Sequence, residues 1–437
     1  MGPPPIQNPV AFREALAVWV KIGFLGFGGP AGQIALMHKI MVEEKRWIDD
    51  ARFLHALNYC ILLPGPEAQQ LAIYIGWLLH GVRGGLAAGV LFVLPGAATV
   101  LALALAYARF SELALVQGLF LGIKAGVLAL VIEAFAKIAG RVLKDRLSRL
   151  IAGGAFVALF AFSVPFPVIV LSAAVIGAVR ARSPGREDGA TPPIERGPAP
   201  HWSASARILS IGLAAWLGPV VLLRAGLGTD HILSALALFF SQVATVAFGG
   251  AYAILSYVAQ HAVVTQGWLS PDQMLDGLGL AETTPGPLIL VLEFVGFLAA
   301  FTAPGSLDPY VMGTLGALVV LWATFAPCFV WIFLGAPYVE RLRSHARLAA
   351  ILGAVTSAVA GVILNLSLWF AVHTLFRETM EVTSFGLRLT LPVVTAPAPV
   401  AMAIAAASCV SLFALRWGTL ATLGAAAALG VAAAMVA

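Results

Sequence analysis

The chain is poor in charged residues and in cysteine. Asp, Glu, Lys and Arg make up only 11% of its 437 residues, whereas 60% are hydrophobic, a balance outside that of soluble domains. Cys60, Cys328 and Cys409 lie far apart, without a CxxC pair or histidines at metal-ligand spacing, so neither a disulfide framework nor a zinc motif is indicated. The HExxH, GxSxG and Walker motifs are also missing, and hydrolase or ATPase chemistry is not predicted. We expect no metal and no cofactor.

Long apolar runs are what the sequence does contain. Residues 84–107 and 311–336 exceed the roughly 20 apolar residues that cross the hydrocarbon core of a bilayer. The N-terminus lacks a basic segment followed by a short apolar stretch and a cleavage site, so no removable signal peptide is predicted. The net charge of +5 comes from basic residues in short loops, which favours a role in membrane orientation over nucleic-acid binding. We predict an all-α polytopic membrane protein.

The sequence divides at residues 180–207, a stretch rich in Pro, Gly, Ser and charge that is typical of an aqueous linker. The two apolar halves resemble each other at a constant offset of 221 residues, the difference between 248 and 27: "FGG" 27–29 aligns with "FGG" 248–250, and "PGP" 64–66 with "PGP" 285–287. Such internal similarity predicts a repeat protein, and in transporters it places the site at the repeat interface. The predicted parts are an N-terminal repeat (1–180), a cytoplasmic linker (181–207) and a C-terminal repeat (208–437).

The charges predict that the two repeats are inverted in the membrane. Between its FGG and PGP motifs the first half carries Lys39, Lys45, Arg46 and Arg52, whereas residues 260–273 contain neither Lys nor Arg. Because Lys and Arg favour the cytoplasmic side, these two loops are predicted to lie on opposite sides of the membrane.

A path through the membrane follows if the helices break at FGGP and PGP and form re-entrant hairpins. We then expect spans at about 86–108 and 112–136, a pair of short helices within 151–179, a linking span near 208–223 and an amphipathic interfacial segment at 38–55. The alternative is a set of continuous spans that are only kinked at proline.

The breaks themselves suggest a binding site. Pro30 and Pro66 suit the first turn of a new helix, and the neighbouring glycines let the chain turn. A helix that starts inside the membrane has unpaired N–H groups, which with the helix dipole suit a tetrahedral oxyanion. Close helix packing through glycine is the alternative, but repetition of both motifs at one offset favours binding. The predicted site comprises Phe27, Gly28, Gly29, Pro30, Pro64, Gly65, Pro66, Gln70, Gly249, Gly250, Thr284, Pro285, Gly286 and Pro287.

Ionisable residues in the apolar segments add further candidates, because such residues are costly in a membrane. Lys21 and Lys124 can add positive charge to the site; alternatively, Lys21 reaches the interface and Lys124 pairs with Glu133. Glu67 and Glu282 are candidates for proton coupling, or else they cap helices. The polar side chains next to the PGP motifs either donate to an oxyanion or satisfy carbonyl groups of the broken helices: Gln69, Gln70, Thr283 and Thr284.

Five stretches resemble the chromate ion transporter family in its long form with two homologous halves. These are "FGFGGPAGQIALMHKIMVEEKRWID", "LLPGPEAQQLAIYIGWLLHG", "VAFGGAYAILSYV", "GWLSPDQML" and "TTPGPLILVLEFVGF". The resemblance covers most of the chain and is strongest in the N-terminal half. It implies a multi-pass secondary transporter of the bacterial inner membrane that exports chromate, confers chromate resistance and is related to sulfate handling. The family's characteristic positions fall on Phe27, Gly28, Gly29, Pro30, Pro64, Gly65, Pro66, Glu67, Gln70, Gly249, Gly250, Pro285, Gly286 and Pro287.

The second half departs from this pattern, since Ala251 replaces the proline of FGGP and Leu288 stands where Glu67 does. One site dominated by N-terminal elements is therefore favoured over two equivalent sites.

The hypothesis from sequence is a transporter, not an enzyme, that expels the chromate dianion by using the membrane potential or protons through Glu67 or Glu282. The alternatives are a transporter of sulfate or another oxyanion, an anion channel, and an intramembrane enzyme, for which no redox cysteine pair, haem ligand or cofactor fingerprint is visible. The expected partners are the anion and membrane lipid, with a homodimer as the default expectation.

Overall fold

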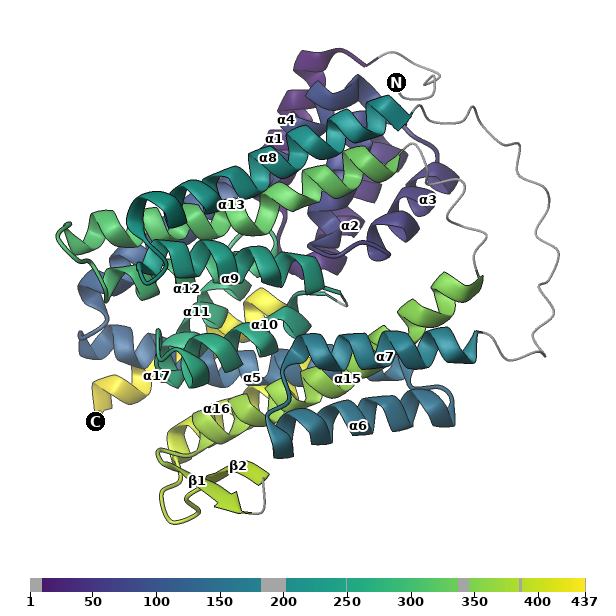
Figure 1. The fold of residues 1–437 in the computed structure, drawn as a ribbon. Coiled ribbons are helices and arrows are strands. Elements are labelled where there is room, and N and C mark those ends of the chain that lie inside the picture. Colours follow the sequence, from purple (N-terminus) through teal and green to yellow (C-terminus); the bar gives the residue numbers. More distant parts are fainter. Residues whose placement is uncertain (1–9, 182–201, 249, 337–345, 385–386, 437) are drawn as a thin grey trace. The chain divides into compact units, whose positions relative to one another are not determined.

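The computed structural model describes residues 10–181, 202–248, 250–336, 346–384 and 387–436. Helices form nearly all of this part of the chain (Figure 1), which confirms the all-α polytopic class. A single antiparallel hairpin of β1 (Thr379–Ser384) and β2 (Leu387–Pro392) is the exception among the described residues. Alternation of apolar and polar residues, as in Leu-Arg-Leu-Thr-Leu, gives this segment its strand character.

Six helices of the described residues are long and apolar enough to cross a membrane. The predicted spans at 86–108 and 208–223 fall within α4 (Glu67–Phe110) and α8 (Trp202–Leu227), and the span at 112–136 largely coincides with α5 (Ala114–Val142). The predicted pair of short helices is α6 (Arg146–Phe162) and α7 (Phe166–Arg180). Non-helical backbone at His80 and Gly81 divides α4 into two parts. The six candidate spans are Glu67–Phe110, Ala114–Val142, Ser205–Leu227, Pro309–Gly335, Ala350–Leu375 and Thr419–Val436.

The helices gather into two compact units. The first unit takes Met1–Ala104, Gly185–Gly250 and Thr284–Ala346. Within it, α13 packs against α8, α9 and α12. Its elements are α1 (Phe12–Leu25), α2 (Gly29–His38), η1 (Lys39–Glu44), α3 (Asp50–Ile61), most of α4 (Glu67–Phe110), α8 (Trp202–Leu227), α9 (Ile232–Val246), η3 (Leu288–Leu290), α12 (Val291–Phe301) and α13 (Pro309–Gly335).

The second unit takes Leu105–Pro184, Ala251–Thr283 and Arg347–Ala437. Here α5 packs against α11, α16 and α17, and small residues such as Gly118, Gly122 and Gly430 let α5 and α17 approach closely. Besides α6, α7 and the β-hairpin, its elements are α5 (Ala114–Val142), α10 (Ala251–Ala259), η2 (Gln260–Thr265), α11 (Pro271–Thr283), α15 (Ala346–Leu375), α16 (Pro399–Cys409), η5 (Val410–Ala414) and α17 (Thr419–Val436).

Each unit draws segments from both halves of the sequence. The repeats are defined by sequence similarity and the compact units by packing, so the boundaries of the repeats and those of the units need not coincide. The repeat boundaries at 180 and 208 stay a prediction, and the predicted linker falls mostly on residues 182–201, outside the described residues.

A short backbone motif occurs three times in the described part of the chain. After each of η1, η2 and η5 comes a residue with positive φ, namely Arg46, Gly267 or Arg416, and then a tryptophan. The backbone N–H of each tryptophan donates to the carbonyl oxygen six residues earlier. The N–O distances are 2.9, 2.7 and 2.9 Å for Trp47, Trp268 and Trp417. The first two copies keep the offset seen in the sequence; the third, in the C-terminal segment, is not predicted by it.

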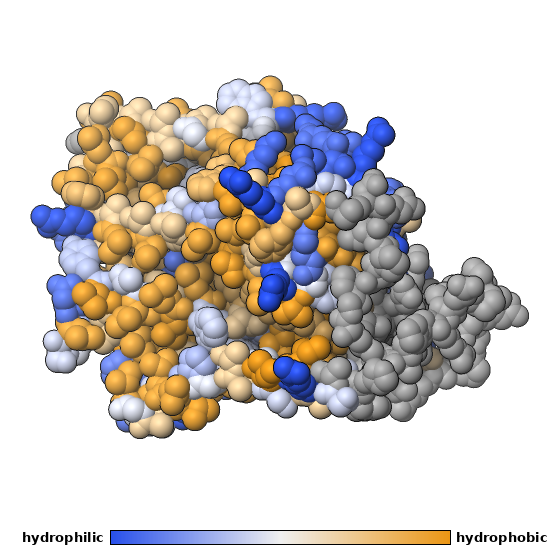
Figure 2. Space-filling model, turned by 90° about the horizontal axis from the view of Figure 1, so that it is seen from above, coloured by the Kyte–Doolittle hydropathy of each residue, from blue (hydrophilic) through white to orange (hydrophobic). Residues whose placement is uncertain are grey.

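The surface of the described residues is rich in apolar side chains. Orange, apolar residues cover much of the face shown in Figure 2. Leucines such as Leu222 and Leu150 are 73% and 72% exposed. Lipid is the solvent in which such exposure costs nothing, so the surface agrees with a membrane location.

Candidate functional site

The first predicted break lies between α1 and α2. α1 ends at Leu25, and Gly28 adopts the left-handed conformation with φ of +83°. α2 then starts at Gly29 with Pro30 in its first turn, where a missing N–H removes no helical hydrogen bond. No side chain caps this helix start. The helix therefore breaks at FGGP rather than continuing through a kink.

The second break separates α3 from α4. Gly65 is buried and has φ of +118°, a conformation that favours glycine. The side chain of Gln70, in the first turns of α4, donates from Nε2 to the carbonyl oxygen of Pro64 at 2.7 Å. This amide therefore satisfies a carbonyl of the broken helix, which is one of the two roles predicted for it.

The second half of the sequence repeats both breaks. α9 ends at Val246, Gly250 has φ of +91°, and α10 starts at Ala251, whereas Gly249 lies outside the described residues. At the other motif α11 ends at Thr283, Gly286 has φ of +96°, and η3 leads directly into α12.

Backbone hydrogen bonds join the breaks across the two halves, inside the first unit. The N–H of Gly65 donates to the carbonyl of Ala247 at 2.9 Å, and the N–H of Gly286 donates to the carbonyl of Gly26 at 2.9 Å. Gly26 and Ala247, like Gly65 and Gly286, are equivalent at the offset of 221 residues. Exchange of the halves thus maps one bond onto the other. Each PGP motif is tied to the residue immediately before the FGG motif of the opposite half.

Gln33 is a residue of this region that the sequence analysis missed. It is fully buried on α2 and donates from Nε2 to the carbonyl of Gly26 at 3.1 Å, so that this oxygen accepts two hydrogen bonds. A glutamine one turn after FGGP is the signal that points to it. The Oε1 atoms of Gln33, Gln69 and Gln70 are all buried without a hydrogen-bond partner among the described residues.

Close packing holds the second PGP motif in place. Gly96 of α4 lies against the backbone of Pro285 and Gly286, and a Cβ at Gly96 would meet the carbonyl oxygen of Pro285 and lie 3.1 Å from the Cα of Gly286. The Cβ position of Gly65 likewise lies 3.0 Å from Sγ of Cys328. The glycines therefore serve packing as well as turning.

The helix starts of the two PGP motifs differ in exposure. Pro66 and Glu67 are half-buried, whereas Gly286, Pro287 and Leu288 are buried. The start of α2 is also reachable, with Gly28 exposed and Gly29 and Pro30 half-buried. Among the described residues, the first half offers helix-start N–H groups near an accessible surface at both of its motifs, whereas the PGP helix start of the second half is buried.

Two charged site candidates, Lys21 and Glu67, lie in the first unit. Lys21 is exposed on α1, and Glu67 is half-buried at the start of α4. Neither side chain has a hydrogen bond or ion pair with another described residue. The exposure of Lys21 suits a side chain that reaches the interface.

Lys124 lies in the second unit and pairs with two carboxylates of α11. Its Nζ is 2.8 Å from Oδ1 of Asp272 and 3.5 Å from Oδ1 of Asp276. The hydroxyl of Tyr107 donates to Oδ2 of Asp276 at 2.8 Å. Glu133, the partner considered from the sequence, pairs instead with Lys137 at 2.6 Å. The positive charge of Lys124 is therefore balanced within its own unit.

The residues before the second PGP motif have partners of their own. The hydroxyl of Tyr252 donates to Oε1 of Glu282 at 2.6 Å in the second unit. The hydroxyl of Thr283 donates to the carbonyl of Leu280 at 2.9 Å. Thr283 therefore satisfies a carbonyl group of its own helix, which is one of the two roles predicted for it. Thr284 is buried.

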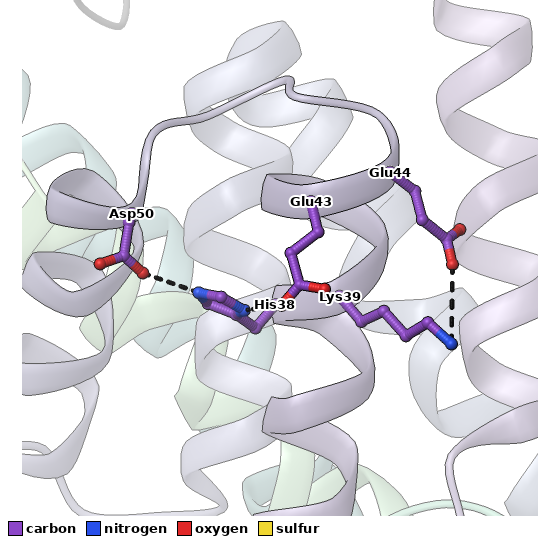
Figure 3. Close-up of polar contacts among 5 residues, drawn as sticks. All are labelled: His38, Lys39, Glu43, Glu44 and Asp50. Carbon is purple, nitrogen blue, oxygen red and sulfur yellow. Dashed lines mark hydrogen bonds and ion pairs between the residues drawn. The ribbon is translucent and has the colours of Figure 1, made fainter.

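The predicted interfacial segment folds as the turn from α2 through η1 into α3 (Figure 3). His38 contacts Oδ1 of Asp50 at 2.7 Å through Nε2 and Oε1 of Glu43 at 3.2 Å through Nδ1. Nζ of Lys39 lies 3.9 Å from Oε1 of Glu44. The hydrogen bond with Asp50 is the largest cause that raises the pKa of His38 above its ordinary value; burial opposes it, and the hydrogen bond with Glu43 adds to it. The cluster ties the two arms of the turn together.

These features define a class of protein: a multi-pass membrane protein with broken helices that are hydrogen-bonded to one another inside one compact unit, an arrangement found in transporters. The chain matches the chromate transporter family over residues 13–178 and 234–431, and it belongs to that family.

Three relatives show the extent of the similarity. The chain is 31% identical over 362 residues to the chromate transport protein of Pseudomonas aeruginosa, which covers 82% of this chain and 80% of that protein. It is 30% identical over 354 residues to the chromate transport protein of Cupriavidus metallidurans, with 80% of each chain covered. It is 29% identical over 385 residues to a probable chromate transport protein of Synechococcus elongatus, covering 86% and 87%. No solved structure matches the chain.

Proposed function

We propose that this chromate transporter is a secondary transporter that exports chromate from the bacterial cytoplasm across the inner membrane and so confers resistance. Support comes from the family, from the printed names of relatives that align over most of the chain, and from the broken helices. In this proposal chromate crosses the membrane without a change in oxidation state, so no catalytic group is assigned.

The observation that carries the proposal is the reciprocal pairing of the breaks through Gly65–Ala247 and Gly286–Gly26. It holds helix starts at fixed positions within one unit, and a helix start supplies N–H donors and a positive dipole end to an anion. The anion would contact the accessible starts after Pro30 and Pro66. The buried second-half motif, with Pro285, Gly286 and Pro287, then acts as the support rather than as an equal site.

Backbone donors fit a dianion that must be released again. A fixed, fully desolvated lysine would hold chromate strongly, whereas N–H groups stabilise it without a whole opposing charge. Lys21 can add charge from the exposed face of α1. Lys124 can do so only when Asp272 and Asp276 release it.

The membrane potential favours export. Moving a negative charge out of a cell that is negative inside gains about 2.3 kcal/mol per charge per 100 mV. Protons are an additional drive, for which Glu67 and Glu282 are the candidates from sequence. Alternating access by movement of one repeat against the other requires the bonds that join the two halves, Gly65–Ala247 and Gly286–Gly26, to break during the cycle.

The test adds a charge to the start of α2. Ala31 is exposed in the first turn of that helix, where a carboxylate stabilises the helix but repels an anion. We expect Ala31→Glu to raise the KM for chromate uptake into inverted membrane vesicles at least tenfold, while Ala31→Gln, of nearly the same shape, stays within twofold of wild type. Membrane insertion of both variants is checked by quantitative blotting.

Three results would contradict parts of the proposal. Equal KM values for the two variants would remove the helix start of α2 from the binding site. Sulfate uptake that outcompetes chromate would assign a different oxyanion. Flux without counterflow of labelled chromate would indicate a channel.

A further inference from the structure

A buried carboxyl group on α12 lies outside every role described above. Glu293 is in the first turn of α12, within the first unit, and is 1% exposed. Both Oε1 and Oε2 are buried and have no hydrogen-bond partner among the described residues. In this respect it differs from Glu67, which is half-buried, and from Glu282, which accepts a hydrogen bond from Tyr252.

Among the described residues, no charged side chain lies on the helices that pack against α12. α12 packs against α9 and α13, and neither Ile232–Val246 nor Pro309–Gly335 contains Asp, Glu, Lys, Arg or His. Their titratable groups are Tyr310, which packs on Phe301 at the far end of α12, and Cys328. The part of α4 that touches η3 through Gly96 and Leu290 has no titratable residue from 84 to 104.

An ionised carboxylate without partner or water is among the most costly groups in a protein interior. Glu293 therefore holds its proton in this conformation. A purely structural role explains the residue poorly, because an apolar side chain of similar size would fill the same space at lower free energy.

The position of Glu293 connects it to the breaks. It follows Gly286, whose N–H is bonded to Gly26, by less than two helical turns through η3. Any movement of the second PGP motif against the FGG motif of the first half moves the start of α12. Once water reaches this first turn, the positive end of the helix dipole favours the ionised form.

We propose that Glu293 is the proton-carrying carboxyl of the transport cycle, an inference that rests on the proposed function. The carboxyl O–H keeps its proton while α12 stays packed against α9 and α13. The proton passes to water when the start of α12 opens, leaving the carboxylate, and it is replaced from the other side after the conformational change. Glu293 thus takes the coupling role that the sequence suggested for Glu67 or Glu282.

The test uses purified protein in proteoliposomes, with the membrane potential clamped by potassium and valinomycin. We expect a pH gradient of 2 units to change chromate flux severalfold in the wild type. Glu293→Gln, which mimics the protonated form, retains chromate–chromate exchange within about threefold but loses the response to the gradient. Glu133→Gln, a carboxyl that pairs with Lys137, serves as the control and keeps that response.

A second measurement does not depend on chromate. Dicyclohexylcarbodiimide adds to protonated carboxyl groups in apolar surroundings, and we expect mass spectrometry to find the adduct at Glu293 at pH 7. A full gradient response in Glu293→Gln, a wild-type flux that ignores the gradient, or an unmodified Glu293 would each overturn the inference. A modified Glu293 in a wild-type protein that moves no chromate would instead overturn the proposed substrate.

Discussion

Two polar regions of this protein are built in opposite ways. In the first unit, the glycine N–H of each PGP motif donates to the residue just before the FGG motif of the other half. Buried side-chain acceptors such as Oε1 of Gln33 and of Gln70 have no hydrogen-bond partner among the described residues. In the second unit, one cation, Lys124, is paired with two carboxyl groups, those of Asp272 and Asp276. The unsatisfied side-chain atoms at the breaks are therefore acceptors, so the donors available to an anion there are the backbone N–H groups of the helix starts. The cation of the ion cluster already has two carboxyl partners.

The largest expected effect comes from breaking the ion cluster. Lys124→Met leaves Asp276, which is 6% exposed, with Tyr107 as its remaining partner. Loss of one member of a buried pair is expected to lower the free energy of unfolding by about 3 kcal/mol. The measurement is the thermal unfolding midpoint of the protein in detergent.

The double variant Lys124→Met with Asp276→Asn separates structure from binding. It should recover much of the lost stability because no unpaired charge stays buried. A normal unfolding midpoint in Lys124→Met together with a large rise in KM for chromate would show the opposite, that Lys124 contacts the anion.

The next effect tests the close approach at the second PGP motif. In Gly96→Ala the new methyl group meets the carbonyl of Pro285, and overpacking of this kind is expected to cost about 2 to 3 kcal/mol. Transport should fall with it, since the bond between Gly286 and Gly26 must shift. Gly226→Ala on α8, where an added Cβ meets nothing within 4 Å, is the matched control. Equal stability of the two variants would mean that the motif has room to move.

A smaller effect is expected from the side chain that supports the first PGP motif. Gln70→Leu leaves the carbonyl of Pro64 without its 2.7 Å hydrogen bond, which should cost about 1 to 2 kcal/mol. Gln117→Leu on the exposed face of α5 should change the unfolding midpoint little. If both variants unfold at the same temperature, water satisfies Pro64, and the motif is wetter than its burial indicates.

The breaks could be predicted from the sequence because glycine and proline act locally. Positive φ at Gly28, Gly65 and Gly286 and the proline in the first turn of α2 follow from residue type. The repeat offset also predicted that the motifs would be equivalent. It did not predict that each PGP bonds to the residue just before the FGG of the other half, because that pairing depends on how distant segments cross.

The partners of charged residues were harder to predict. Lys124 pairs with Asp272, 148 residues away, and nothing in the local sequence indicates that choice. Glu293 was missed because one acidic residue in an apolar segment carries no motif; only burial and the missing partners give it significance. The assignment of helix ends by residue type therefore succeeds where long-range pairing of side chains does not.

The smallest effect concerns an ion pair of the same kind as the one at Lys124, but exposed to solvent. The pKa of His38 is raised in the folded protein by Asp50, so this pair stabilises the fold at pH values below the unfolded pKa and loses its effect as the pH rises through the folded pKa. Because the side chains are exposed, the contribution should stay below about 1 kcal/mol. The difference in unfolding midpoint between wild type and Asp50→Asn should therefore shrink from pH 6 to pH 8.5. Glu44→Gln, which loses the pair with Lys39, provides the control with a difference that is independent of pH over this range. A constant difference for Asp50→Asn would show that Asp50 acts through the dipole of α3 and not through His38.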